Sequence, residues 1–244
     1  MMRIAFLPIL AFALALSATA ARAAPPCSVP EDLALHDLVL PAAKQAAAAS
    51  RQLTILTLGG AHTAGIAAED PKASYPALLQ AALAGALPGI EVKVVNNAKP
   101  GNTVDATLRA IPAAIAASGA KLVIWAPGSL DAVQRPNLSE FFTDLQAGIV
   151  AIRQSGADVM LLDMQYIPLL EQWFRIEDYR DMLRGTAAAT DVPLVQRHEL
   201  MKVWSEQGAL NLDATDKAEQ LQVARDLFAC MVKVLAAPIA DAVR

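Results

Sequence analysis

The feature that most constrains the fold is an apolar run ending in glycines, Leu53 to Gly65, with the sequence Leu-Thr-Ile-Leu-Thr-Leu-Gly-Gly-Ala-His-Thr-Ala-Gly. Its first six residues are apolar or β-branched and predict a buried parallel strand, while the glycines predict a tight loop and then a helix. In an open α/β sheet, ligands bind beyond the carboxyl ends of the strands. The loop after this strand is therefore the first place to expect a functional site.

Further short apolar runs alternate with helical stretches along the chain. We predict strands at residues 53–58, 91–96, 121–126, 157–163 and 192–195. We predict helical segments at residues 30–50, 74–87, 103–118, 138–154, about 169–190 and 217–236, with Pro112 kinking or splitting the third. Strands separated by helices imply right-handed βαβ units, and continuous apolar strands are covered on both faces. The expected fold is a single three-layer α/β/α domain, flavodoxin-like, with five parallel strands.

The first 23 residues have the features of a secretory signal peptide. Arg3 supplies a short basic region, residues 4–16 are almost wholly apolar, and Ala21-Arg22-Ala23 is a small-x-small cleavage site. The apolar run is too short for a transmembrane helix. We therefore expect a mature domain of residues 24–244 that is periplasmic or secreted, without a membrane span after cleavage. An uncleaved anchor is the alternative.

The charge of the mature chain disfavours polyanionic partners. Removal of Arg3 and Arg22 leaves 18 basic against 24 acidic residues, a net charge of −6, and no basic cluster stands out. Nucleic acid and anionic membrane surfaces are therefore not expected as partners.

The cysteines and histidines are few. In an oxidising compartment, Cys27 and Cys230 are expected to form a disulfide that ties the N-terminal arm to the last helix, with two separate buried thiols as the alternative. The three histidines, His36, His62 and His198, stand apart in the sequence. No metal site and no cofactor are expected from this pattern.

The glycine-ended strand resembles the first block of the SGNH (GDSL-type) hydrolases, Gly-Asp-Ser-x-Thr-x-Gly. Gly59, Thr63 and Gly65 match that pattern. Gly60 stands at the aspartate position and Ala61 at the position of the nucleophilic serine. The resemblance implies the same flavodoxin-like fold, but a methyl group cannot act as a nucleophile.

Two later blocks of the family can be matched. Gly101 fits the glycine whose backbone N–H points into the oxyanion hole, although it could equally serve only the tight turn after Pro100. Gly128-Ser129-Leu130-Asp131 resembles the Gly-x-Asn-Asp block, with Leu130 in place of the asparagine. Leucine donates no hydrogen bond, and loss of one oxyanion donor typically costs about 10²–10³ in rate.

The last block, Asp-x-x-His, can be aligned in two ways. One alignment keeps Asp213 and places Asp216 at the histidine position. The other follows the final helix around Cys230 and places Glu219 and Gln222 at the dyad positions. We prefer the second because a helix anchored by its cysteine tolerates fewer insertions than the preceding loop. Either way, the general base of the family is replaced.

The resemblance covers about residues 27 to 240. The segment Val159 to Pro168, together with Met201 and Trp204, is similar to secreted members that look α-proteobacterial. The resemblance thus implies a secreted bacterial SGNH-like protein with a degenerate catalytic site, a pseudoenzyme.

Three functions remain open at this stage. The first is a periplasmic binding or accessory protein for a small acylated or saccharide ligand or a partner protein. The second is an atypical ester hydrolase, acting on carboxylesters or acylated saccharides through substitute residues such as the neighbours His62 and Thr63. The third is a purely structural protein. The polar pocket candidates are Gly60, His62, Thr63, Asn102, Ser129 and Asp131. Residues 60–65 have the glycine spacing of a P-loop, but Ile66-Ala67 replaces the required Lys-Ser/Thr, which excludes nucleotide binding on this motif.

Overall fold

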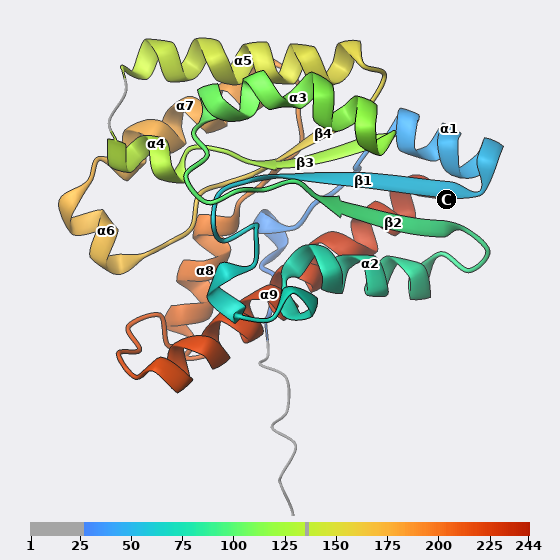
Figure 1. Ribbon diagram of the computed structural model, residues 1–244. Helices are drawn as coiled ribbons and strands as arrows, with labels where there is room; N and C mark the ends of the chain where they lie inside the picture. Colours follow the sequence, from blue (N-terminus) through green and yellow to red (C-terminus); the bar gives the residue numbers. More distant parts are fainter. Residues whose placement is uncertain (1–26, 135–136) are drawn as a thin grey trace, which may run out of the picture.

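A five-stranded parallel sheet forms the centre of the molecule (Figure 1). The computed structural model describes residues 27–134 and 137–244, so the predicted signal peptide, residues 1–23, lies outside the described residues. The strands are β1 (Gln52–Gly59), β2 (Glu91–Asn96), β3 (Leu122–Ala126), β4 (Asp158–Leu162) and β5 (Leu194–Val195). Their order is β2-β1-β3-β4-β5, which confirms the predicted fold. The direction in which successive strands are added reverses between β1 and β3, and doubly wound sheets bind ligands at such a point.

The register of the central strands brings their carboxyl ends together. Gly59 at the end of β1 pairs with Ala126 at the end of β3, and Thr57 pairs with Asn96 at the end of β2. The loops that follow these three strands therefore start side by side. Residues of β3 are buried along its whole length, as expected for a strand covered on both faces.

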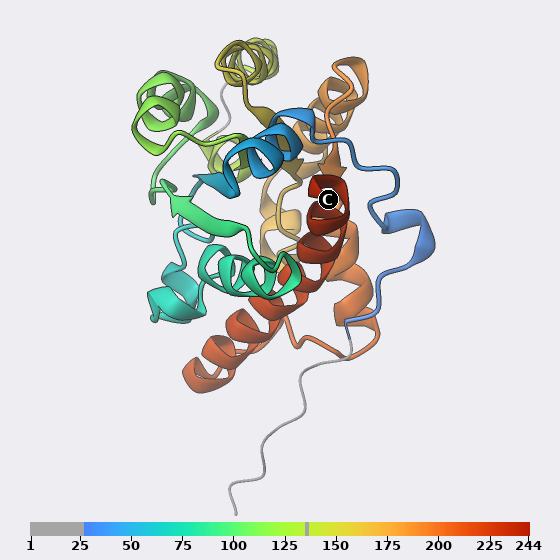
Figure 2. The ribbon, with the colours of Figure 1, turned by 90° about the vertical axis from the view of Figure 1, so that its right-hand side faces the viewer.

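Helices cover both faces of the sheet (Figures 1 and 2). One apolar cluster lies between the sheet and three helices, which are α3 (Val104–Ser118), α5 (Leu138–Gln154) and α7 (Ile176–Ala189). The other joins the opposite face to four helices, which are α1 (Pro41–Ser50), α2 (Tyr75–Ala86), α8 (Arg197–Glu206) and α9 (Lys217–Val243). No helix of the described part is both long and apolar enough to cross a membrane.

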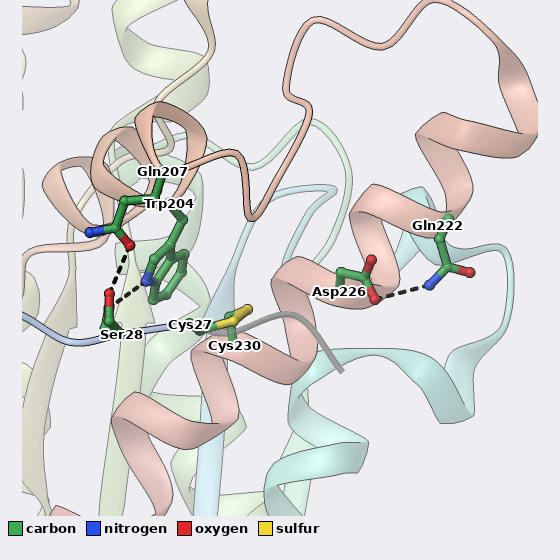
Figure 3. The surroundings of a disulfide bond; sticks show 7 residues. All are labelled: Cys27, Ser28, Trp204, Gln207, Gln222, Asp226 and Cys230. Carbon is green, nitrogen blue, oxygen red and sulfur yellow. Dashed lines mark hydrogen bonds between the residues drawn. A yellow bond between two sulfur atoms is a disulfide. The ribbon is translucent and has the colours of Figure 1, made fainter. Parts of the chain in front are cut away.

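A disulfide between Cys27 and Cys230 ties the N-terminal arm to α9, as predicted (Figure 3). Ser28, the next residue of the arm, forms hydrogen bonds with α8 and with the turn that follows this helix. Trp204 Nε1 donates to the Ser28 carbonyl oxygen at 2.7 Å, and the Ser28 hydroxyl donates to Gln207 Oε1 at 2.8 Å. The arm thereby links α8 and α9 on one face of the sheet.

Several helices differ from the sequence prediction. Only η1 (Glu31–Leu33) and α1 are helical in the predicted segment 30–50. The segment 169–190 forms two helices, α6 (Pro168–Trp173) and α7, because Phe174 between them is extended. Two further helices, α4 (Ser129–Gln134) and α8, were not predicted. Proline does not split a helix here, since α3 continues through Pro112.

The loop after β1 also differs from expectation, because it does not lead directly into an α-helix. Two short 3-10 turns, η2 (Ile66–Ala68) and η3 (Pro71–Ala73), precede α2. The chain cannot become α-helical earlier, since Gly65 and Glu69 both adopt left-handed backbone conformations with φ of 86° and 56°. The backbone N–H groups of this loop are therefore not the first turn of an α-helix.

Candidate functional site

A pocket of about 220 Å³ lies at the carboxyl ends of the central strands. Figure 1 shows α4, α6 and α8 gathered around this end of the sheet. The structure brings three family positions together here, Ala61 after β1, Gly101 after β2 and Leu130 after β3. The complete lining is Gly60, Ala61, His62, Thr63, Gly101, Asn102, Ala126, Ser129, Leu130, Gln165 and Arg197.

The glycines of the first block are required by the geometry of the loop. Gly59 has a φ of 150°, and an added Cβ would lie 2.8 Å from Thr63 Oγ1. Gly65 has a φ of 86°, and an added Cβ would lie 2.6 Å from the Ser74 Cβ. Both close approaches exclude a larger residue. These matches to the family pattern therefore preserve the shape of the loop, independently of any nucleophile.

Gly101 has a φ of 84° and lines the pocket. An added Cβ at this position would meet no atom within 4 Å, so its backbone conformation, and not a lack of space, requires glycine. The turn therefore accounts for Gly101, and its place in the lining is compatible with the oxyanion position implied by the resemblance.

Asp131, predicted as a pocket residue, lies outside the pocket lining. Its Oδ1 accepts a hydrogen bond from the Val104 backbone N–H at 3.1 Å, at the start of α3. Burial raises the pKa of Asp131, while this hydrogen bond acts in the opposite direction. The Asp131 carboxylate therefore holds the start of α3 against α4. It also lines a separate depression with Asp105 and Asp144.

The predicted dyad positions on α9 also lie outside the pocket lining. Glu219 accepts from Asn211 Nδ2 at 2.7 Å, and Gln222 donates to Asp226 Oδ1 at 2.9 Å (Figure 3). In the other alignment, Asp216 accepts from the Glu219 backbone N–H as the N-cap of α9. Among the described residues that line the pocket, none is a carboxylate.

Arg197, the first residue of α8, lines the pocket and was not predicted from the sequence. It is only 2% exposed. Its Nε donates to the Asp163 carbonyl oxygen at 2.7 Å, and in the described part of the chain the guanidinium forms no ion pair. Burial lowers the pKa of Arg197 to about 10, so the side chain is still charged at neutral pH. The pocket therefore carries one buried positive charge.

His62 lies beside that charge. Burial and then the Arg197 charge lower the pKa of His62 well below its usual value, so the imidazole is neutral at neutral pH. Its ring packs on Phe228 of α9 with centroids 4.6 Å apart. Its Nε2 is buried and has no hydrogen-bond acceptor or donor among the described residues. His62 is thus held in place by packing and not by a triad carboxylate.

A second unsatisfied polar atom lies close to Arg197. The Tyr75 hydroxyl at the start of α2 is buried without a hydrogen-bond partner in the described part of the chain. Burial raises the pKa of Tyr75 to about 12, while the Arg197 charge acts in the opposite direction. Tyr75 is absent from the pocket lining, so its hydroxyl is not a contact for a ligand in the pocket.

The remaining histidine considered from the sequence, His198, points elsewhere. Its Nε2 lies 2.8 Å from Glu171 Oε1 of α6, and its ring stands edge-on to Tyr166. It is absent from the pocket lining, so it is a structural contact between α6 and α8.

The chain belongs to the non-GDSL lipase-like family, whose model matches residues 26–244. The sheet order and the pocket at the carboxyl ends agree with this assignment to an SGNH-like lipase and esterase fold. No curated protein matches the chain.

Solved structures with the same fold include esterases and lipases. The structure of TesA is 26% identical, with a TM-score of 0.58, covering 75% of this chain and 99% of its own. The acetyl xylan esterase AlAXEase is 14% identical, with a TM-score of 0.58, covering 72% and 98%. The lipase/acylhydrolase from Enterococcus faecalis is 21% identical, with a TM-score of 0.57, covering 74% and 94%. The last two likenesses concern the fold alone.

The pocket lining offers a guanidinium, a neutral imidazole, amides at Asn102 and Gln165 and a hydroxyl at Ser129. Ala61, at the position that the resemblance assigns to the nucleophile, contributes a methyl group to the lining. Arg197 could have been suspected from its place, since it is the second residue after β5, at the carboxyl end of the sheet where ligands bind.

Proposed function

We propose that this protein is a non-catalytic SGNH-fold protein that keeps the family's pocket as a ligand-binding site. The observation that carries the proposal is the composition of the pocket lining. Ala61 and Leu130 stand at the positions of the serine and asparagine, and among the described lining residues no carboxylate accompanies His62. Removing a triad serine or histidine alone can cost about 10⁶ in turnover.

The geometry supports binding more than a filled, purely structural site. The pocket has open volume, and it is lined by a buried charge, Arg197, whose terminal nitrogens have no hydrogen-bond acceptor among the described residues. The disulfide fits an extracytoplasmic location. We therefore propose a secreted or periplasmic binding or accessory protein, with a small molecule or a partner protein as the recognised species.

The test is the reaction of the mature protein with a fluorophosphonate probe and with short acyl esters. We expect no labelling and no turnover above buffer, and none after Ala61→Ser, because the new hydroxyl would have no carboxylate-supported base and no side-chain donor at Leu130. The lipase/acylhydrolase from Enterococcus faecalis, run in the same assay, serves as the positive control.

The alternative is an atypical ester hydrolase that uses substitute residues. His62 and Thr63 both line the pocket, and the neutral imidazole could act as a base. Robust turnover by the unmodified protein that is abolished by His62→Ala or by Thr63→Ala would establish this alternative and overturn the non-catalytic proposal.

A further inference from the structure

The guanidinium of Arg197 is held in a fixed position but has no carboxylate partner among the described residues. Its Nε is anchored to the Asp163 carbonyl oxygen, so the side chain is fixed in direction. In the described part of the chain its two terminal nitrogens, Nη1 and Nη2, donate to no acceptor, although the residue is 2% exposed and lines the pocket. A buried charge is stable only when it is paired and hydrogen-bonded. A species outside this chain would therefore complete the site.

We propose that the pocket binds a small organic monocarboxylate, whose carboxylate group pairs with the guanidinium of Arg197. This identifies the ligand class for the proposed binding function and rests on it. The planar guanidinium offers two parallel N–H groups that match a carboxylate in a bidentate arrangement.

Charge balance favours a monoanion. In the described lining Arg197 carries the single positive charge, His62 is neutral, and no carboxylate is present. A monocarboxylate neutralises this site, whereas a phosphate dianion would leave an excess negative charge in a buried place.

The rest of the lining fits a short apolar group attached to the carboxylate. Ala61, Ala126 and Leu130 contribute apolar surface to the pocket. Its volume of about 220 Å³ lies below the range of about 300–1,000 Å³ that is usual for drug-sized ligands. A short-chain acid, with a few carbon atoms beyond the carboxylate, is the class that this space fits.

The experiment is isothermal titration of the mature, oxidised protein with sodium acetate, propionate and butyrate at pH 7 and constant ionic strength. Propionamide has the shape of propionate without its charge, and inorganic phosphate tests the other anion chemistry. We expect measurable binding of at least one of the three carboxylates, and at least tenfold weaker binding of both propionamide and phosphate.

Variants separate the site from general charge effects. Arg197→Met should weaken carboxylate binding by tenfold or more, because it removes the pairing charge. Arg109→Met is the matched control, since Arg109 is an exposed arginine of α3 that pairs with Asp105 outside the pocket. If Arg197→Met fails to fold, Ala61→Leu fills the pocket from a wall without charge and should reduce binding similarly.

Three results would overturn the inference. They are the absence of binding of all three acids up to 100 mM, equal binding of propionate and propionamide, and unchanged carboxylate affinity in a folded Arg197→Met protein or, where that variant does not fold, in Ala61→Leu. The proposed function fails separately, through ester turnover or probe labelling. A protein that hydrolyses esters and also binds carboxylates would refute the non-catalytic proposal and leave this inference standing.

Discussion

Two arginines of this protein are equally buried and have opposite surroundings. Arg180 on α7 and Arg197 on α8 are each 2% exposed. Arg180 Nη2 lies 3.1 Å from Asp163 Oδ2 and 2.7 Å from Glu199 Oε1, and its Nη1 lies 2.6 Å from Glu177 Oε2. Among the described residues, the Arg197 side chain hydrogen-bonds only to the backbone carbonyl oxygen of Asp163.

The difference shows that burial of a charge alone does not mark a binding site. The carboxylates around Arg180 raise the pKa of its guanidinium against the effect of burial, whereas burial dominates at Arg197 and lowers its pKa to about 10. Paired charges of this kind are part of the scaffold, while an unpaired one beside a pocket is a candidate for ligand recognition. Asp163 belongs to both regions, since its side chain serves Arg180 and its carbonyl serves Arg197.

The largest expected effect is the loss of stability when the disulfide is removed, and this loss should differ between the helices that carry the two arginines. The disulfide ties the N-terminal arm to the face of the sheet that holds α8 and α9, and α7 lies on the other face. Its sequence separation is 203 residues, so replacement of both Cys27 and Cys230 by serine should cost about 5 kcal/mol of unfolding free energy on the chain-entropy model.

Urea unfolding and hydrogen exchange of the oxidised and the double-serine proteins measure this effect. We expect α8 to lose protection more than α7, because Trp204 on α8 loses the tethered Ser28 carbonyl as its acceptor. Equal loss of protection in both helices would contradict a local role for the arm. Free-thiol titration of the unfolded, unreduced protein should find none, which checks the starting state.

The second prediction concerns Arg180, the arginine that is paired with carboxylates. Arg180→Met leaves Asp163, which is fully buried, without its counter-charge, and removing one partner of a buried pair costs about 3–5 kcal/mol. Urea unfolding measures the loss. The matched control is Arg184→Met on the same helix, whose pairs with Glu177 and Asp181 are partly exposed and should be worth at most about 1 kcal/mol. Similar losses in the two variants would refute the scaffold role of Arg180.

The same contrast explains how far the sequence alone leads. Apolar runs and glycines act locally, so the strand positions, the parallel sheet and the shape of the loop around Gly59 and Gly65 were predictable. The placement of Ala61, Gly101 and Leu130 around one pocket follows from the same strand order.

The charged part of the site was not predictable in this way. Whether an arginine is paired depends on tertiary contacts, and nothing in the residues around Arg197 distinguishes it from Arg180. The alignment of the last block failed to locate a pocket residue for a related reason. It assumed that α9 presents Glu219 and Gln222 to the site. Instead, Glu219 accepts a hydrogen bond from Asn211, and Gln222 donates one to Asp226 of the same helix. Asp131 resembled a pocket acid, yet it is used to hold the Val104 backbone N–H.

A third prediction uses pH to detect the charge of Arg197 through its neighbour. Burial and the Arg197 charge lower the pKa of His62 well below 6.5, so the unfolded state binds a proton that the folded state does not. Stability should therefore fall as pH falls below about 6.5, by up to about 1.4 kcal/mol per pH unit from this group. His62→Gln should remove that part of the slope between pH 7.5 and 4.5, measured by urea unfolding at each pH.

The control for this measurement is His36→Gln, which removes an exposed imidazole of the N-terminal segment, and the slopes of the two variants are compared directly. Arg197→Met should reduce the slope only in part, because burial is the larger cause of the His62 shift and remains. A wild-type slope in the His62→Gln protein would show that folding does not lower the pKa of His62.

The smallest expected effect is the change in stability caused by Arg197→Met. It is compared directly with the change caused by Arg180→Met. The substitution removes the hydrogen bond from Nε to the Asp163 carbonyl oxygen, which is worth about 1 kcal/mol, but it also removes a buried charge without a carboxylate. Methionine fills much of the same space with a flexible apolar chain. The two terms oppose each other, so urea unfolding should give a stability within about 1 kcal/mol of the wild type. A loss of about 3 kcal/mol or more, as for Arg180, would mean that Arg197 is scaffold as well, and that its charge is satisfied by the protein without a ligand.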